Sequence, residues 1–273
     1  MERGCLTLVR PLPKQSPPLL TRGRREVEMS PSEPPDDRRA TNDRPMVAQT
    51  IVFSEVDVVR EGRSALEAVS LTLAEHRIGI VGLNGSGKST LLKAIVGLVR
   101  PTGGRITVDG RDAIAEARAV RATTGFLFQD PDNQIVFPIV AEDLAFGLKN
   151  HGFDRRETAA RVAAALDRLG IGGFAKRRIH ELSGGEKQLV ALAGVLALGP
   201  KTVLFDEPTS QLDLRNRNRL EDVLRVMPEQ AIVVAHDLEL LADFDRVIVM
   251  EAGRVVADDR PARALAVYRE RAA

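Results

Sequence analysis

The sequence predicts an α/β fold built on a mainly parallel sheet with helices on both faces. Short, β-branched apolar runs at 78–81, 202–205 and 231–235 are typical of strands that are covered on both faces. A glycine-rich stretch follows the first run and leads into an apolar, helix-forming run at 91–99. Helical periodicity between 138 and 179 predicts an inserted helical segment. The order strand, glycine loop, helix indicates a ligand at the carboxyl ends of the strands.

The other predicted elements surround this centre. Apolar and polar residues alternate at 50–59 and 68–73, which predicts an antiparallel edge sheet ahead of the first buried strand. Turn residues and local propensity predict strands at 105–108 and 125–128, a helix at 113–121, a terminal hairpin of 247–250 with 254–257, and a closing helix at 261–273.

Composition limits the possible partners and the extent of the folded domain. The net charge of the 273 residues is +1, so charge balance gives no attraction to nucleic acid or anionic lipid. The single cysteine, Cys5, excludes an intramolecular disulfide, and no apolar run approaches the roughly 20 residues that cross a bilayer. Prolines and mixed charges predict that residues 1–46 form a disordered tail, and residues 47–273 are expected to form the folded domain.

The glycine-rich stretch Gly82–Thr90 has the G-x-x-x-x-G-K-[ST] pattern of a P-loop. Its glycines allow positive φ angles and a close approach of backbone N–H groups to phosphate, and the following helix N-terminus favours negative charge. Lys88 is expected to reach the β- and γ-phosphates, and the Ser89 hydroxyl to ligate Mg²⁺. The sequence therefore predicts a nucleoside triphosphate site made by Gly82, Asn84, Gly85, Ser86, Gly87, Lys88, Ser89 and Thr90.

Two carboxylates, Asp206 and Glu207, directly follow the apolar run at 202–205. Because strand carboxyl ends line the ligand crevice of a parallel sheet, both side chains are expected beside the phosphates. Asp206 is suited to hold Mg²⁺ through water. Glu207 is expected to polarise the attacking water as a general base, a role worth roughly 10²–10⁴ in rate. The pair predicts that the triphosphate is hydrolysed.

A second anion-binding helix start is predicted in the sequence Leu-Ser-Gly-Gly-Glu-Lys-Gln at 182–188. Ser183 is suited to cap the helix that follows, while Gly184 and Gly185 expose backbone N–H groups. One nucleotide needs only one nest at its β-phosphate. The second site is therefore expected to serve a nucleotide that is bound to another copy of the protein.

These motifs, in this order, resemble those of the ATP-binding-cassette (ABC) ATPases over residues 47–257. The resemblance implies an ABC-type P-loop NTPase domain with a RecA-like core, an antiparallel β edge sheet and an inserted helical subdomain at about 138–182. Glu186 stands where the family signature usually has glutamine.

The resemblance also implies roles for single residues and a dimeric assembly. Gln129 is similar to the Q-loop glutamine, which contacts Mg²⁺, and His236 is similar to the histidine that senses the γ-phosphate. The implied catalytic residues are Glu207, His236, Gln129 and Lys88, and the implied Mg²⁺ ligands are Ser89, Gln129 and Asp206. In a head-to-tail dimer, each ATP would also meet Ser183, Gly184, Gly185 and the D-loop residue Asp213 of the other subunit.

Residues 128–147 resemble the Q-loop and adjoining groove of energy-coupling-factor (ECF) ATPases, which power vitamin and metal-ion uptake. This implies a homodimer or a pair with a second ABC ATPase, an integral membrane coupling (T) subunit, and a substrate-binding (S) subunit. It also implies a peripheral location at the cytoplasmic face of the inner membrane. The candidates for the apolar floor of the groove are Phe137, Val140, Leu144 and Phe146.

Residues 73–84 are similar to the ATPase subunits of bacterial biotin transporters, so biotin is the expected substrate. Cobalt or nickel uptake is the nearest alternative, because substrate choice lies in other subunits. A soluble cassette ATPase of DNA repair or chromosome maintenance would carry a coiled coil or zinc-binding insert between Lys88 and Ser183, and cysteines for zinc are absent there. No nucleic-acid partner is therefore expected. A P-loop kinase transfers phosphate to a small acceptor and needs no second anion site, so that class does not account for residues 182–186.

Overall fold

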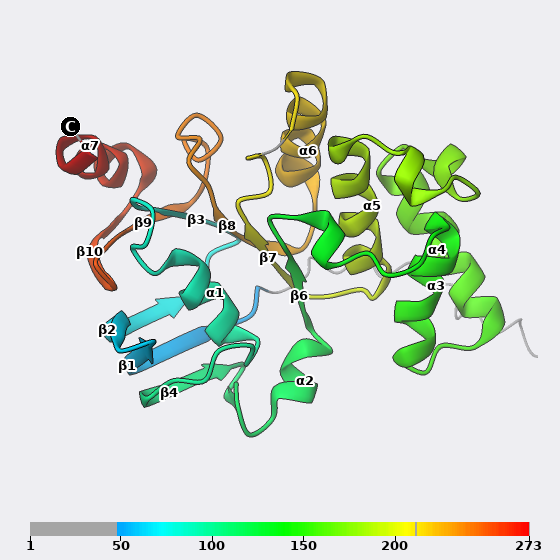
Figure 1. Cartoon of the computed structure of the whole chain (residues 1–273). Helices are drawn as coiled ribbons and strands as arrows, with labels where there is room; N and C mark the ends of the chain where they lie inside the picture. Colours follow the sequence, from blue (N-terminus) through cyan, green and yellow to red (C-terminus); the bar gives the residue numbers. More distant parts are fainter. Residues whose placement is uncertain (1–47, 211, 273) are drawn as a thin grey trace, which may run out of the picture. The chain divides into compact units, whose positions relative to one another are not determined.

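The computed structural model describes residues 48–210 and 212–272, so the predicted tail at 1–46 lies outside the described residues. Its centre is a six-stranded sheet in the order β10-β9-β3-β8-β7-β6 (Figure 1). The strands from β6 to β9 run parallel, and β10 pairs antiparallel with β9. The bounds are β3 (Arg77–Val81), β6 (Thr124–Leu127), β7 (Thr202–Asp206), β8 (Gln230–Val234), β9 (Arg246–Glu251) and β10 (Arg254–Asp259). The α/β class predicted from the apolar runs is confirmed.

A second, antiparallel sheet has the order β2-β1-β4-β5. The predicted pairing of its first two strands is confirmed, with Ile51 opposite Leu73 and Val58 opposite Leu66. The pair is not an extension of the central sheet, because no strand ladder among the described residues joins the two sheets. The bounds are β1 (Ile51–Arg60), β2 (Arg63–Leu73), β4 (Gly103–Val108) and β5 (Arg111–Asp112).

The helices cover both faces of the central sheet (Figure 1). Ile78 and Ile80 of β3 pack with α1 and the antiparallel sheet, whereas Val203 and Phe205 of β7 pack with the helices between α3 and α6. No helix of the described residues is both long and apolar enough to cross a bilayer. The bounds are α1 (Lys88–Ile95), α2 (Ala117–Arg121), α3 (Val140–Asn150), α4 (Arg155–Arg168), α5 (Gly184–Ala197), α6 (Leu214–Val226), α7 (Pro261–Ala272), and the 3-10 turns η1 (Pro131–Asn133), η2 (Gly172–Phe174) and η3 (Ile179–Glu181).

Three helices differ from the prediction for local reasons. The helix after the P-loop ends at Ile95, not at 99, because Gly97 takes a φ of +66°. The helix expected at 113–121 begins only at Ala117, because the Asp112 carboxylate accepts hydrogen bonds from the backbone N–H groups that follow it and holds them in a turn. Helix α6 was not predicted, since it buries only Leu220 and Leu224 among many charged residues.

Candidate nucleotide-binding site

The P-loop takes the conformation that its glycines permit. Gly85 and Gly87 have φ angles of +80° and +101°, where L-residues are strained. Gly82 is required for another reason, because a Cβ atom there would lie 2.2 Å from the Met250 carbonyl oxygen. Asn84 and Gly85 are exposed at the tip, and Thr90 is half-buried in the first turn of α1. The loop therefore places its backbone as an anion nest requires.

The two functional side chains of the loop are already hydrogen-bonded within the chain. Lys88 is only 4% exposed, and its Nζ donates to the carbonyl oxygens of Gly82 (2.8 Å) and Leu83 (3.0 Å). Burial lowers the pKa of Lys88, and the negative charges of Glu207 and Asp206 oppose that shift. The Ser89 hydroxyl donates to Asp206 Oδ1 at 2.6 Å. Lys88 keeps a third N–H donor, and the Ser89 oxygen keeps its lone pairs, so both groups can contact a ligand from these positions.

Ser86 is buried within the loop, and its Oγ has no hydrogen-bond partner among the described residues. A Cβ atom on Gly82 would lie 2.5 Å from this oxygen, which is a second reason for glycine at that position. The role of Ser86 in binding the nucleotide stays a prediction.

Three predicted residues from separate segments meet at the carboxyl end of the sheet. The Gln129 side chain donates to Glu207 Oε2 at 3.2 Å, and His236 Nε2 lies 3.1 Å from Glu207 Oε1. Gln129 also contacts the Ser210 hydroxyl, at 3.3 Å, which the sequence analysis missed. Glu207 has a φ of +51°, a strained conformation for a residue with a side chain, and such strain is concentrated at functional sites. The geometry brings together an amide, a carboxylate and an imidazole around one point.

The residues near Asp206 fit a hard divalent cation. Its carboxylate is nearly buried, contacts the Ser89 hydroxyl, and has Lys93 Nζ 3.6 Å away. No group of three or more His, Cys, Asp or Glu side chains in the described residues could hold a metal by itself. That donor set suits Mg²⁺, which is usually bound by one or two protein oxygens together with phosphates and water.

The second anion site forms the N-terminus of α5. The Ser183 hydroxyl accepts from the Glu186 backbone N–H (3.3 Å), and the Glu186 carboxylate accepts from the Ser183 backbone N–H (2.8 Å), which is a complete capping box. Arg177 donates to Glu186 at 3.0 Å, a contact that the spacing did not reveal. The Ser183 backbone N–H and Arg177 lower the pKa of Glu186. The glutamate in place of glutamine therefore keeps the capping box and adds an ion pair with Arg177.

The glycines of this site differ in their surroundings. Gly184 is exposed, and a Cβ atom there would meet nothing within 4 Å. Gly185 is buried, and a Cβ atom on it would lie 2.4 Å from Asn216 Nδ2. Asn216 in turn donates to Asp213, which caps α6. Among the described residues, no hydrogen bond joins this region to the P-loop.

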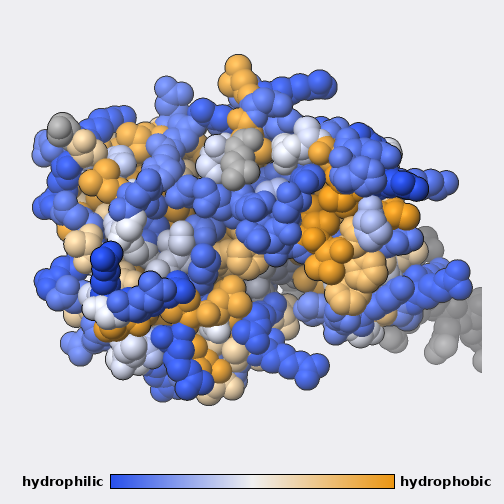
Figure 2. Space-filling model, viewed as in Figure 1, coloured by the Kyte–Doolittle hydropathy of each residue, from blue (hydrophilic) through white to orange (hydrophobic). Residues whose placement is uncertain are grey.

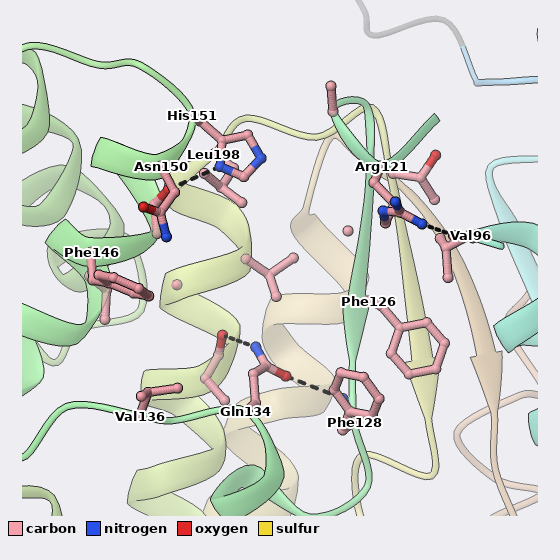
Figure 3. Close-up of a pocket in the computed structure, with 18 of the residues that line it drawn as sticks. Val96, Arg121, Phe126, Phe128, Gln134, Val136, Phe146, Asn150, His151 and Leu198 are labelled. Atoms are coloured by element: carbon pink, nitrogen blue, oxygen red, sulfur yellow. Dashed lines mark hydrogen bonds between the residues drawn. The ribbon is translucent and has the colours of Figure 1, made fainter. Parts of the chain in front are cut away.

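An apolar groove of about 730 Å³ lies between the central sheet and helices α3 and α5. Phe146 and Val136 lie on one side of it and Phe126 and Phe128 on the other (Figure 3). Figure 2 shows hydrophobic side chains gathered over this helical part of the molecule. Of the four candidates for the floor, Leu144 and Phe146 line the groove. Val140 does not, because it is fully buried in the core, and Phe137 packs at a tilt against Phe146 with the ring centroids 4.8 Å apart.

Comparisons with known proteins agree with this architecture. The family described as "ABC transporter" matches residues 66–210. A putative ABC transporter ATP-binding protein of Deinococcus radiodurans is 54% identical over 209 residues, which are 77% of this chain and 92% of that protein. The solved structure of cbiO1 from Clostridium perfringens, part of the ABC transporter complex cbiONQ, superposes with a TM-score of 0.72 at 30% identity and covers 82% of this chain and 94% of that one.

Two further relatives are named for their transport substrates. The biotin transport ATP-binding protein BioM of Rhizobium etli is 51% identical over 223 residues, 82% of this chain and 99% of that protein. The cobalt import ATP-binding protein CbiO of Syntrophus aciditrophicus is 40% identical over 205 residues, 73% of each chain. The chain therefore belongs to the ABC transporter family. Within that family it is an ATP-hydrolysing, ATP-binding subunit of the energy-coupling-factor type.

Proposed function

We propose that this chain energises biotin uptake through an ECF-type membrane transporter. The observation that carries the proposal is the 51% identity to BioM of Rhizobium etli, which spans 99% of that protein. A cobalt or nickel importer is the second candidate, supported by the 40% identity to CbiO. The relatives are transporter subunits, so a soluble ATPase of DNA repair or chromosome maintenance is not retained.

In this function the P-loop binds the phosphates of ATP through its backbone N–H groups. Lys88, held by the Gly82 and Leu83 carbonyls, directs its remaining N–H donor to the β- and γ-phosphates. Ser89, Asp206 and Gln129 would hold Mg²⁺. When bound, the cation supplies charge neutralisation on the oxygens of the β- and γ-phosphates.

Hydrolysis follows from the cluster around Glu207. The Glu207 carboxylate accepts a proton from water as the water oxygen bonds to the γ-phosphorus and the bond from that phosphorus to ADP breaks. Gln129 contacts one carboxylate oxygen of Glu207 and His236 contacts the other, so the two side chains orient the base. His236 also donates a hydrogen bond to the departing phosphate.

Two copies, or one copy and a second ABC ATPase, complete each ATP site. Ser183 and Gly184 face outward at the start of α5, and Gly185 and Asp213 support that face through Asn216. Outward-facing donors at a helix N-terminus suit a phosphate brought by another subunit. ATP thereby favours the closed pair, and loss of the γ-phosphate favours opening.

The groove beside α3 receives a helix of the integral coupling (T) subunit, and a separate S subunit binds the substrate. The helices between about 138 and 182 act as the subdomain that transmits motion to this groove. The chain thus works as a peripheral subunit at the cytoplasmic face of the inner membrane, and no nucleic acid is a partner.

The catalytic part of the proposal is tested by replacing Glu207 with glutamine. We expect phosphate release from MgATP to fall about 100- to 1,000-fold, because the amide cannot accept the proton. Light scattering should then show a stable dimer with ATP bound. Glu142→Gln, an exposed position on α3, is the control and should match wild type. Wild-type turnover in Glu207→Gln would exclude Glu207 as the base.

The substrate is tested in a strain that lacks this gene. We expect this strain to lose high-affinity biotin uptake and to keep normal cobalt uptake. The wild-type gene should restore biotin uptake, and the gene for the Glu207→Gln variant should not. Loss of cobalt or nickel uptake alone would favour the second candidate.

A further inference from the structure

The peptide groups on both sides of Phe128 are held by glutamine side chains. Gln134 Oε1 accepts from the Phe128 backbone N–H at 3.3 Å, and Gln188 Nε2 donates to the Phe128 carbonyl at 3.2 Å. The pairing of β6 with β7 ends one residue earlier, at Leu127. Beyond the sheet, the position of this backbone therefore depends on two side chains and not on a strand neighbour.

Both glutamines connect Phe128 to helix α5. Gln188 belongs to α5, and Gln134 Nε2 donates to the Ala191 carbonyl of the same helix at 3.0 Å. Figure 3 shows Gln134 between Phe128 and this helix. Gln188 is 2% exposed, and its Oε1 has no partner among the described residues. A buried amide with an unsatisfied oxygen is costly, so packing alone does not explain a glutamine here.

Gln129, whose side chain reaches Glu207, directly follows Phe128. A change in the Phe128 peptide therefore moves the amide that orients the general base. A displacement of about 1 Å in such a group is enough to lower a rate by up to 100-fold. Gln134 and Phe128 also line the apolar groove, so a segment seated there contacts this connection directly.

We propose that Gln134 and Gln188 are positioning residues that set the place of Gln129, and that they link the N-terminal half of α5 and the groove to the rate of hydrolysis. The inference rests on the proposed role of Gln129 in ATP hydrolysis. It adds two residues that contact neither nucleotide nor the reacting water.

The test measures steady-state hydrolysis of MgATP by the purified full chain. Gln134→Met and Gln188→Met keep the length of the side chain and remove its amide. We expect kcat to fall about tenfold in each, while the KM for ATP stays within twofold and Tm within a few degrees of wild type. Asn218→Met is the matched control, because Asn218 is an exposed amide on α6 that makes no bond to Phe128, and it should keep the wild-type kcat. If Gln188→Met fails to fold, the half-buried Gln134 carries the test.

Two further variants separate positioning from general damage. In a Gln129→Ala background, Gln134→Met should change kcat less than twofold, because its effect passes through Gln129. Gln134→Glu keeps the acceptor for the Phe128 N–H and loses the donor to Ala191, so its kcat should lie between wild type and Gln134→Met. Unchanged kcat in both Met variants, or the same tenfold loss without Gln129, would overturn the inference. Failure of the proposed role of Gln129 is distinct, since Gln129→Ala alone would then keep the wild-type kcat.

Discussion

The P-loop and the N-terminus of α5 are both predicted to bind anions at a helix start, but they are built in opposite ways. At the P-loop, Lys88 and Ser89 are turned inward and bonded to Gly82, Leu83 and Asp206. At α5, the side-chain bonds of Ser183 and Glu186 are closed on the helix itself, and Gly184 faces outward. The first site thus directs its functional side chains inward, whereas the second has a closed cap and an exposed backbone at Gly184.

This difference suits the two sites to the separate roles proposed above. A site with a buried lysine and a carboxylate nearby binds and activates a charged ligand within one subunit. A rigid, capped helix start with an exposed glycine is suited to recognising a ligand that is already bound elsewhere. Changes at the first site should therefore affect nucleotide affinity, and changes at the second should affect turnover of the assembled pair.

The largest effect is expected at the first site, from Lys88→Ala. Removal of the ammonium should weaken MgATP binding about 100-fold, since hydrogen bonds to charged groups contribute about 1.5–3 kcal/mol each. Isothermal titration calorimetry measures the affinity. Lys93→Ala, which removes the ammonium 3.6 Å from Asp206, is the control and should weaken binding less. Affinity within threefold of wild type in Lys88→Ala would contradict a role in phosphate binding.

The next effect is expected at the second site, from Gly184→Asp. A side chain fits there, because a Cβ atom meets nothing within 4 Å, but its carboxylate would face the phosphates of the neighbouring ATP. We expect kcat to fall about tenfold or more, in line with like-charge repulsion across an interface. ATP affinity of the single subunit should not change. Gly184→Ala, with no charge, is the control, and equal loss in both variants would argue against an electrostatic cause.

The smallest effect is expected from Glu186→Gln, which keeps the cap and removes the charge. The pKa of Glu186 is lowered in the folded chain, so the charged form stabilises the fold above the unfolded pKa of about 4.3 and this contribution is lost as pH falls through the folded pKa. At pH 7 the variant should have a Tm about 2 °C below wild type.

Scanning calorimetry from pH 7 to pH 3 checks the sign. The two Tm values should converge in the acid range, since the protonated carboxyl and the amide then carry the same charge. A difference that persists unchanged to pH 3 would show that the charge of Glu186 does not stabilise the helix start.

Much of the fold follows from local patterns in the sequence. The runs at 202–205 and 231–235 are β-branched and apolar, and both are buried strands of the central sheet. Helix α6 was missed for the opposite reason, since its pattern is dominated by arginine and asparagine, and only its packing makes it a helix. Local patterning identifies elements that are buried on most sides and fails for those that bury a narrow stripe.

The site shows the same limit. The P-loop is one contiguous motif, and the carboxylates after β7 form another, so the spacing within each motif indicates a nucleotide site. Phe128 follows a strand, Gln134 follows a 3-10 turn and Gln188 lies in helix α5. The hydrogen bonds from the two glutamines to Phe128 therefore cannot be read from any spacing in the sequence. The bond from Gln129 to Ser210 and the close approach of Asn216 to Gly185 were missed likewise, because each joins segments that are far apart in the sequence.

The inward bonds of Lys88 and Ser89 have a thermodynamic consequence. Because these bonds fix both side chains before a nucleotide arrives, less side-chain conformational entropy is lost when ATP binds. The phosphate contacts then add to bonds that already exist, so little of their free energy is spent on ordering the loop.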